Sequence, residues 1–259
     1  MTDAPRLDYY ARPRGARQLV LLAHGGLSQS SAGSSGWWPP LLRMLPFAGV
    51  AVSTAPSAAV AMLRYRLQGW NGESKDAATD LRTVLRELPT GIERVLLIGH
   101  SMGGRAVVHA AGSRAVVGVC ALAPWLPSGE PLGDLGGRRL VFAHGTADTT
   151  TDFGATAEFV RRCRQRGWPA AFFAVAGEQH QMLRRAPAWE DLVARFVATG
   201  TSGRPDRLLD DATTSDPSRR PTPLAAAGRG GAPFGAASVV AASLRMAPRR
   251  LRLNRTRPV

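Results

Sequence analysis

Residues 94–104 read RVLLIGHSMGG, and this stretch decides the fold that we expect for the chain. The run Arg94–Ile98 is apolar after its first residue and predicts a strand that is buried on both faces. The residues after it fit the pattern G-x-S-x-G, in which a sharp turn from strand to helix exposes a serine hydroxyl. Ser101 is therefore a candidate nucleophile, and the alternative interpretation is a plain structural turn.

Strands and helices are predicted to alternate around this turn. Short apolar runs predict strands at residues 18–23, 60–65, 94–98, 116–122, 139–143 and 170–175. Apolar residues at helical spacing predict helices at 76–88, 102–111, 153–166 and 187–198, with a proline-containing, partly helical stretch at 38–52. The alternation predicts an α/β fold, with a mostly parallel sheet and helices on both faces. Ligands of such sheets bind beyond the C-terminal ends of the strands.

Two further candidate side chains follow later strands. The run 139–143 leads into Asp148 and the run 170–175 leads into His180, so we expect both at the sheet edge that carries Ser101. A serine hydroxyl needs a base to remove its proton, and the base needs a carboxylate to orient it. We therefore interpret His180 as the base and Asp148 as the acid, with Asp152 as an alternative acid further from the strand end.

The loop after the first strand, His24-Gly25-Gly26-Leu27, is rich in glycine. An oxyanion needs N–H donors at close range, and glycines let the backbone approach it. The expected donors are Met102, at the start of the helix after Ser101, and Gly26, with Leu27 as the second choice for the loop. We interpret the remaining histidines as structural, two of them bonded to loop backbone (His24 and His144) and two others at the elbow and in a buried helix (His100 and His109).

Together these motifs resemble those of α/β-hydrolases. The residues that carry the resemblance are Gly99-His100-Ser101-Met102-Gly103-Gly104, His24-Gly25-Gly26, His144-Gly145-x-x-Asp148 and the late His180. The resemblance implies a triad of Ser101, His180 and Asp148 on a minimal core at about residues 15–200. It also implies that the antiparallel N-terminal strands of larger members are missing. Because segment 123–138 is short where larger members often insert a helical lid, we expect an open, lidless site.

The expected substrate pocket borders Ser101. Trp70 and Asn71 follow one predicted strand, and Trp125 follows another. Trp125 would offer an apolar wall to an acyl or alcohol group. The alternative is that the tryptophans only pack the sheet edge.

The chain is strongly basic. Its 259 residues include 33 basic and 19 acidic ones, for a net charge of +14, and Lys75 is its single lysine. Half of this excess lies in 201–259, which is rich in Arg, Pro, Ser, Gly and Ala and has little periodicity. We therefore predict a catalytic domain at 1–200 and a disordered tail at 201–259. Arginine replaces lysine in both parts, which favours a chain-wide coding preference over a dedicated binding face.

The leading hypothesis is a serine hydrolase that cleaves a small carboxylic ester or thioester and needs neither cofactor nor metal. The alternative is a non-catalytic binding module of the same fold, with a basic tail that contacts anionic partners. Nucleic acid is not an expected partner, because the cluster Arg249–Arg252 has no aromatic platform beyond Phe234 and no known motif.

Cysteine and hydropathy patterns exclude several classes of protein. The two cysteines, Cys120 and Cys163, belong to no Cys/His cluster, which excludes a disulfide scaffold and a zinc finger. We find no signal peptide and no apolar run of membrane-spanning length. The expectation is therefore a soluble, cytoplasmic protein without a transmembrane segment.

Overall fold

The structure is a computed structural model, and it describes residues 4–34 and 38–225. Its centre is one eight-stranded sheet with the order β1-β3-β2-β4-β5-β6-β7-β8. β1 is antiparallel to β3, and every other neighbouring pair is parallel. The strands are β1 (Arg6–Ala11), β2 (Gln18–Ala23), β3 (Ala59–Arg64), β4 (Arg94–His100), β5 (Val116–Leu122), β6 (Arg139–Gly145), β7 (Ala170–Val175) and β8 (Thr222–Pro223).

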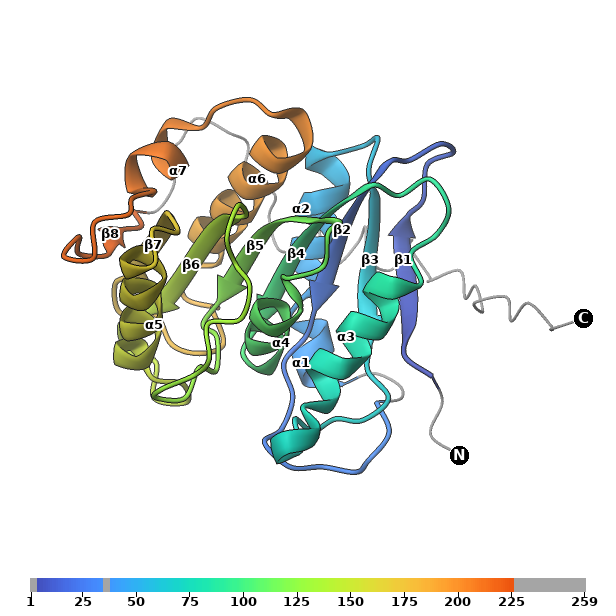
Figure 1. Ribbon diagram of the computed structural model, residues 1–259, viewed down its shortest axis with the longest axis horizontal. Helices are drawn as coiled ribbons and strands as arrows, with labels where there is room; N and C mark the ends of the chain where they lie inside the picture. Colours follow the sequence, from blue (N-terminus) through green and yellow to red (C-terminus); the bar gives the residue numbers. More distant parts are fainter. Residues whose placement is uncertain (1–3, 35–37, 226–259) are drawn as a thin grey trace, which may run out of the picture.

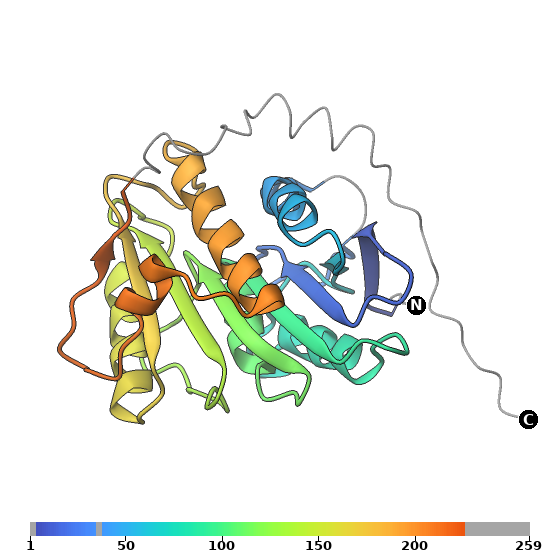
Figure 2. The same cartoon turned by 90° about the horizontal axis from the view of Figure 1, so that it is seen from above.

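Helices cover both faces of the sheet (Figure 1, Figure 2). One face packs against α3 (Asp76–Arg86), α4 (Met102–Ala110) and α5 (Phe153–Gln165). The other face packs against α1 (Pro39–Leu42), α2 (Leu45–Thr54), α6 (Ala186–Ser202) and α7 (Arg207–Ala212). The predicted α/β architecture is confirmed.

Each central strand contributes side chains to two hydrophobic cores. In β2, Leu19 and Leu21 belong to the core under α3, α4 and α5, whereas Val20 and Leu22 belong to the core under α2 and α6. Successive side chains of a strand point to opposite faces, so a strand covered on both sides must be apolar throughout. This requirement is why the continuous apolar runs predicted the strands well.

The proline-containing stretch after residue 38 forms two helices instead of one. Pro39 and Pro40 begin α1, and Pro46 lies in the first turn of α2. Proline lacks an N–H donor and is tolerated in the first turn of a helix but not in its interior. Each proline therefore marks a helix start, and the predicted partial helix divides at Arg43 and Met44.

The expectation that the antiparallel N-terminal strands are missing is wrong in one respect. β1 lies at the edge of the sheet and pairs with β3, and Asp8 in β1 accepts a hydrogen bond of 2.5 Å from Arg64 Nε. As an edge strand, β1 carries charged and tyrosyl side chains. It therefore lacks the continuous apolar run that predicted the other strands. The predicted absence of a lid helix is confirmed, since the segment between β5 and β6 contains no helix.

The predicted end of the folded domain at residue 200 is also wrong. α6 continues to Ser202, α7 follows, and β8 pairs in parallel with β7. Leu209, Ala212 and Leu224 are buried in the core beside α6 and β7. These apolar residues are too few and too widely spaced to produce a periodic pattern. The remainder of the predicted tail, 226–259, lies outside the described residues.

Within the two described ranges, no helix is both long and apolar enough to cross a bilayer.

Candidate active site

Ser101 occupies a strained turn between β4 and α4. Its backbone has φ 55° and ψ −120°, a conformation that side-chain-bearing residues rarely adopt. The turn is so tight that a Cβ on Gly103 would overlap the Ala23 carbonyl, and a Cβ on Gly99 would overlap the backbone of Gly103. These contacts explain why the pattern requires glycine on both sides of the serine. The backbone of Ser101 is held by Leu122, which accepts from its N–H, and by Trp125, which donates to its carbonyl.

The three residues predicted at separate strand ends lie together in space. His180 Nε2 is 3.0 Å from Ser101 Oγ, and His180 Nδ1 is 2.8 Å from Asp148 Oδ2. Ser101 follows β4, Asp148 follows β6, and His180 follows β7, so the parallel sheet brings them to its C-terminal edge. A ring nitrogen that faces a carboxylate carries a proton, which leaves Nε2 free to accept the proton of the serine hydroxyl.

Asp148 is buried and saturated with hydrogen bonds. Its Oδ1 accepts from the N–H groups of Thr150 and Thr151 at 2.8 and 3.0 Å, and its Oδ2 accepts from the Thr151 hydroxyl at 2.9 Å. Burial raises the pKa of Asp148, but the hydrogen bonds from His144, His180 and these N–H groups outweigh it and hold the pKa far below the ordinary value. Asp148 is therefore ionised at neutral pH.

Two buried side chains anchor the loop that carries His180. The Glu178 carboxylate accepts from the N–H groups of Gln179 at 2.9 Å and Arg185 at 2.6 Å, and from the Trp189 indole at 3.3 Å. His100 Nε2 donates to the His180 carbonyl at 3.0 Å. Burial lowers the pKa of His100 to about 3, and the neighbouring His180 acts in the same direction, so His100 is uncharged at neutral pH.

The two backbone N–H groups predicted as oxyanion donors, those of Gly26 and Met102, belong to segments that lie against each other. Among the described residues, nothing accepts a hydrogen bond from the N–H of Gly26 or that of Met102. A Cβ on Gly26 would overlap the Gln68 carbonyl as well as the flexible end of the Met102 side chain, so the close approach of this loop to the Gln68 backbone requires glycine. The second-choice donor, Leu27, is excluded because its N–H donates to the Gln68 carbonyl at 2.9 Å.

The predicted pocket residues have different surroundings. Asn71 is excluded as a substrate contact, because its side-chain amide is already bonded. Its Oδ1 accepts from the Ser30 N–H, and its Nδ2 donates to the Ser30 carbonyl and, at 2.9 Å, to Asp76. Trp70 is buried and packs edge to face against Trp125, and the Arg105 guanidinium lies over both rings, at 4.1 and 4.7 Å from their centroids. Trp70 therefore fits the alternative of packing at the sheet edge. Trp125 is half-buried and stays a predicted wall of the pocket.

His24 and His144 have different hydrogen-bond partners. His24 Nδ1 lies 2.7 Å from the Gly25 carbonyl, as expected for a residue bonded to loop backbone. Burial lowers the pKa of His24 to about 4. His144 contacts loop backbone as predicted, with Nε2 3.3 Å from the Thr151 carbonyl oxygen. Its Nε2 also lies 3.2 Å from Asp148 Oδ2, and its Nδ1 lies 2.9 Å from Thr156 Oγ1.

Sequence reasoning missed three residues that support the site. His144 and Thr151 contact Asp148, and Glu178 fixes the His180 loop. The spacing His144-Gly145-x-x-Asp148 was a usable signal for the first, because it places both side chains at one strand end. Nothing in the sequence marked Glu178. Asp152, the alternative acid, instead caps α5 by accepting from Gly154 N–H.

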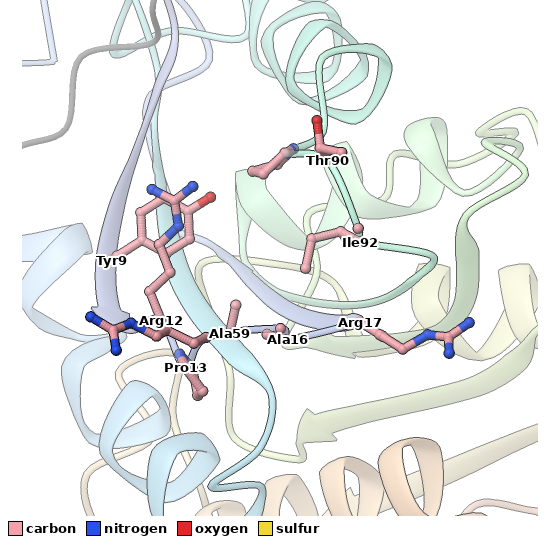
Figure 3. A pocket seen from close by; sticks show the side chains of 12 residues that line it. Tyr9, Arg12, Pro13, Ala16, Arg17, Ala59, Thr90 and Ile92 are labelled. Atoms are coloured by element: carbon pink, nitrogen blue, oxygen red, sulfur yellow. The ribbon is translucent and has the colours of Figure 1, made fainter.

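A surface hollow of about 290 Å³ lies at the opposite edge of the sheet (Figure 3). Its lining comes from the loop between β1 and β2, the start of β3 and the segment before β4. Arg12 lies over the Tyr9 ring, and Arg17 pairs with Glu93. The hollow contains no part of the Ser101 site.

A family model described as the alpha/beta hydrolase family matches residues 20–252. The chain belongs to the alpha/beta hydrolase family. The resemblance to α/β-hydrolases that the motifs indicated is confirmed. No curated protein sequence matches the chain.

Solved structures of other alpha/beta hydrolases share the fold at low sequence identity. Est1E from Butyrivibrio proteoclasticus is 14% identical with a TM-score of 0.53, over 76% of this chain and 94% of that one. An esterase from Pyrobaculum calidifontis is 17% identical with a TM-score of 0.57, over 77% and 80%. XC6422 from Xanthomonas campestris, a serine hydrolase without a lid, is 16% identical with a TM-score of 0.51, over 74% and 87%. At these sequence identities, the similarity supports a shared fold and nothing more specific.

Proposed function

We propose that the protein is a serine hydrolase that cleaves small carboxylic esters or thioesters through an acyl-enzyme. The observation that carries the proposal is the continuous hydrogen-bonded chain from Ser101 Oγ through His180 to Asp148, with separations of 3.0 and 2.8 Å. Family membership and the esterases among the fold neighbours support the same reaction class.

Acylation begins with proton transfer. His180 Nε2 takes the proton of Ser101 while Oγ forms a bond to the carbonyl carbon of the ester. The carbonyl electrons move to oxygen, where the N–H groups of Met102 and Gly26 hold the oxyanion. Collapse of this intermediate expels the alcohol or thiol, which receives the proton from His180.

Deacylation repeats these steps with water. His180 removes a proton from water, the hydroxide adds to the acyl carbon, and Ser101 leaves with the proton returned by His180. Asp148 stays ionised throughout and stabilises the imidazolium that forms in both halves. The segment between β5 and β6 has no helix to cover the site, which favours small, soluble esters.

Covalent labelling tests the proposal directly. A fluorophosphonate probe should label Ser101 in the wild type, and the peptide that carries Ser101 should gain the probe mass. Ser101→Ala should abolish labelling and reduce turnover of p-nitrophenyl acetate and butyrate by about a thousandfold or more, without loss of the folded state. Wild-type turnover by Ser101→Ala would refute the mechanism.

The same experiment separates catalysis from the non-catalytic alternative. A binding module would leave the probe unreacted and would hydrolyse none of the esters. Thioester analogues of the same acyl chains, followed by thiol release, then distinguish an esterase from a thioesterase.

A further inference from the structure

His144 is buried beneath the candidate active site and is bonded on both sides. It lies on β6 and is fully inaccessible to solvent. Its Nε2 is 3.2 Å from Asp148 Oδ2 and 3.3 Å from both the carbonyl oxygen and the hydroxyl of Thr151. Its Nδ1 is 2.9 Å from Thr156 Oγ1 on α5. The proposed reaction uses neither His144 nor Thr156 directly, so these contacts require another explanation.

The partners of the ring decide which nitrogen carries hydrogen. A bare Nε2 lone pair would face a carboxylate oxygen and be repelled by it, so Nε2 must carry a proton. Among the described residues, the Thr156 hydroxyl has no hydrogen-bond partner except His144 Nδ1. With Nδ1 as the acceptor, the hydroxyl proton is satisfied, and a buried hydroxyl without a partner would be costly. The arrangement therefore places an N–H donor against Asp148 Oδ2, with the Thr151 carbonyl as a second acceptor at 3.3 Å.

We infer that His144 is a positioning residue that shares the acceptor oxygen of His180 and thereby limits the basicity of His180. This inference rests on the proposed function, because it concerns the same base. Asp148 Oδ2 receives His180 Nδ1 at 2.8 Å, the Thr151 hydroxyl at 2.9 Å and His144 Nε2 at 3.2 Å. Each added donor withdraws negative charge from the oxygen and weakens its stabilisation of a charged imidazole.

The consequence concerns the pH range of activity. A general base must be uncharged to accept a proton, so limiting its basicity keeps His180 competent in mildly acidic solution. The titratable groups around His180 are Asp148, His144 and His100, and Arg43 at the end of α1 acts on His100. All of these except His144 stay unchanged in the variants below, so a shift in the profile reports on the His144 donor.

Two substitutions at one position separate the donor from the packing. His144→Leu fills much of the same volume without a donor, whereas His144→Gln keeps an amide N–H near the place of Nε2. We expect His144→Leu to move the acidic limb of the kcat/KM profile for p-nitrophenyl acetate upward by about 0.5 to 1 pH unit. The plateau should fall about tenfold, and His144→Gln should return the limb to the wild-type position. An unshifted or lowered limb in folded His144→Leu would overturn the inference.

His109 supplies a matched control. It is a half-buried histidine against a carboxylate, with Nε2 at 2.5 Å from Glu130 Oε1, and it lies outside the Ser101 network. His109→Leu should lower stability and leave the acidic limb in place. An equal shift in this variant would mean that loss of packing, and not loss of the donor to Asp148, moves the profile.

Nuclear magnetic resonance tests the inference without substrate and, in the wild type, without a folding risk. The chain has only five histidines, so their ring nitrogens can be assigned by single substitution. Long-range nitrogen–proton spectra should show His144 with hydrogen on Nε2, and hydrogen on Nδ1 alone would overturn the inference. His144→Leu should shift the ring resonances of His180, because the carboxylate that His180 bonds has lost a donor. If the wild type hydrolyses no ester, the proposed function fails while these spectra still decide the role of His144.

Discussion

The two edges of the sheet differ in what their loops do. At the C-terminal edge, the loops after β4, β6 and β7 bury polar side chains in one continuous network around Ser101. At the N-terminal edge, the loops enclose the hollow of Figure 3, whose polar groups pair at the surface. The side chains of the Arg17–Glu93 pair there are 72% and 54% exposed, whereas Asp148 is 0% exposed.

This difference distinguishes the surface hollow from the candidate active site. Burial strengthens each hydrogen bond at the C-terminal edge and makes each missing partner costly, while water screens the pairs at the N-terminal edge. Substitutions should therefore have large, specific effects at one edge and small ones at the other. The four predictions that follow test this contrast, beginning with the largest effect.

Loss of the Asp148 charge should have the largest effect. Asp148→Asn should reduce kcat for p-nitrophenyl esters by about a thousandfold to ten-thousandfold, because an amide does not stabilise the imidazolium or hold the ring tautomer. The matched control is Asp152→Asn, four residues along the same loop, where asparagine can still cap α5. Steady-state kinetics of the two variants provide the test. Comparable losses in both would show that Asp148 has no special role.

Acid should destabilise the protein through its buried histidines. The folded-state pKa values of His24 and His100 are lowered to about 4 and about 3. The unfolded chain therefore binds protons at these rings below about pH 6.5, while the folded chain does not. Their contribution to stability is complete above that pH and is lost as the pH falls, by about 1.4 kcal/mol per pH unit for each ring.

Urea denaturation between pH 7 and pH 4.5 measures this dependence. His100→Gln should lower the slope of unfolding free energy against pH by about one proton. A slope that His100→Gln leaves unchanged would show that His100 is protonated in the folded protein.

Loss of the Glu178 carboxylate should have an intermediate effect. Glu178→Gln places an amide NH₂ against backbone N–H donors, so the unfolding free energy should fall by about 1 to 3 kcal/mol. Because the loop also positions His180, kcat/KM should fall about tenfold. Urea denaturation and ester kinetics check both effects. The control Glu158→Gln, on the surface of α5, should change neither, and an unaffected Glu178→Gln would refute the anchoring role.

The N-terminal edge should give the smallest effect. Arg17→Ala removes the exposed partner of Glu93, and we expect no measurable change in thermal stability or in ester turnover. Paired melting curves and p-nitrophenyl acetate assays test this. A clear loss of turnover would mean that the hollow communicates with Ser101, which would erase the contrast between the two edges.

The central sheet and the candidate triad could be predicted because each depends on a local signal. Apolar runs such as Val116–Leu122 are obligatory for strands covered on both sides, and their ends fix which residues reach the C-terminal edge. The outermost strands of the sheet, β1 and β8, carry no such signal. β1 and β8 escaped prediction because one side of an edge strand is free to be polar, and because Thr222–Pro223 is only two residues long.

The amino-acid sequence by itself determined the fold class, the glycine turn at Ser101 and the order in which Ser101, Asp148 and His180 follow their strands. Those features are local, because strand burial and tight turns restrict residue types one position at a time. The tertiary structure alone decided that Leu27 and Asn71 are already bonded, that Glu178 anchors the loop that carries His180, and that His144 contacts Asp148. Hydrogen-bond partners are chosen by proximity in three dimensions, which sequence spacing does not encode.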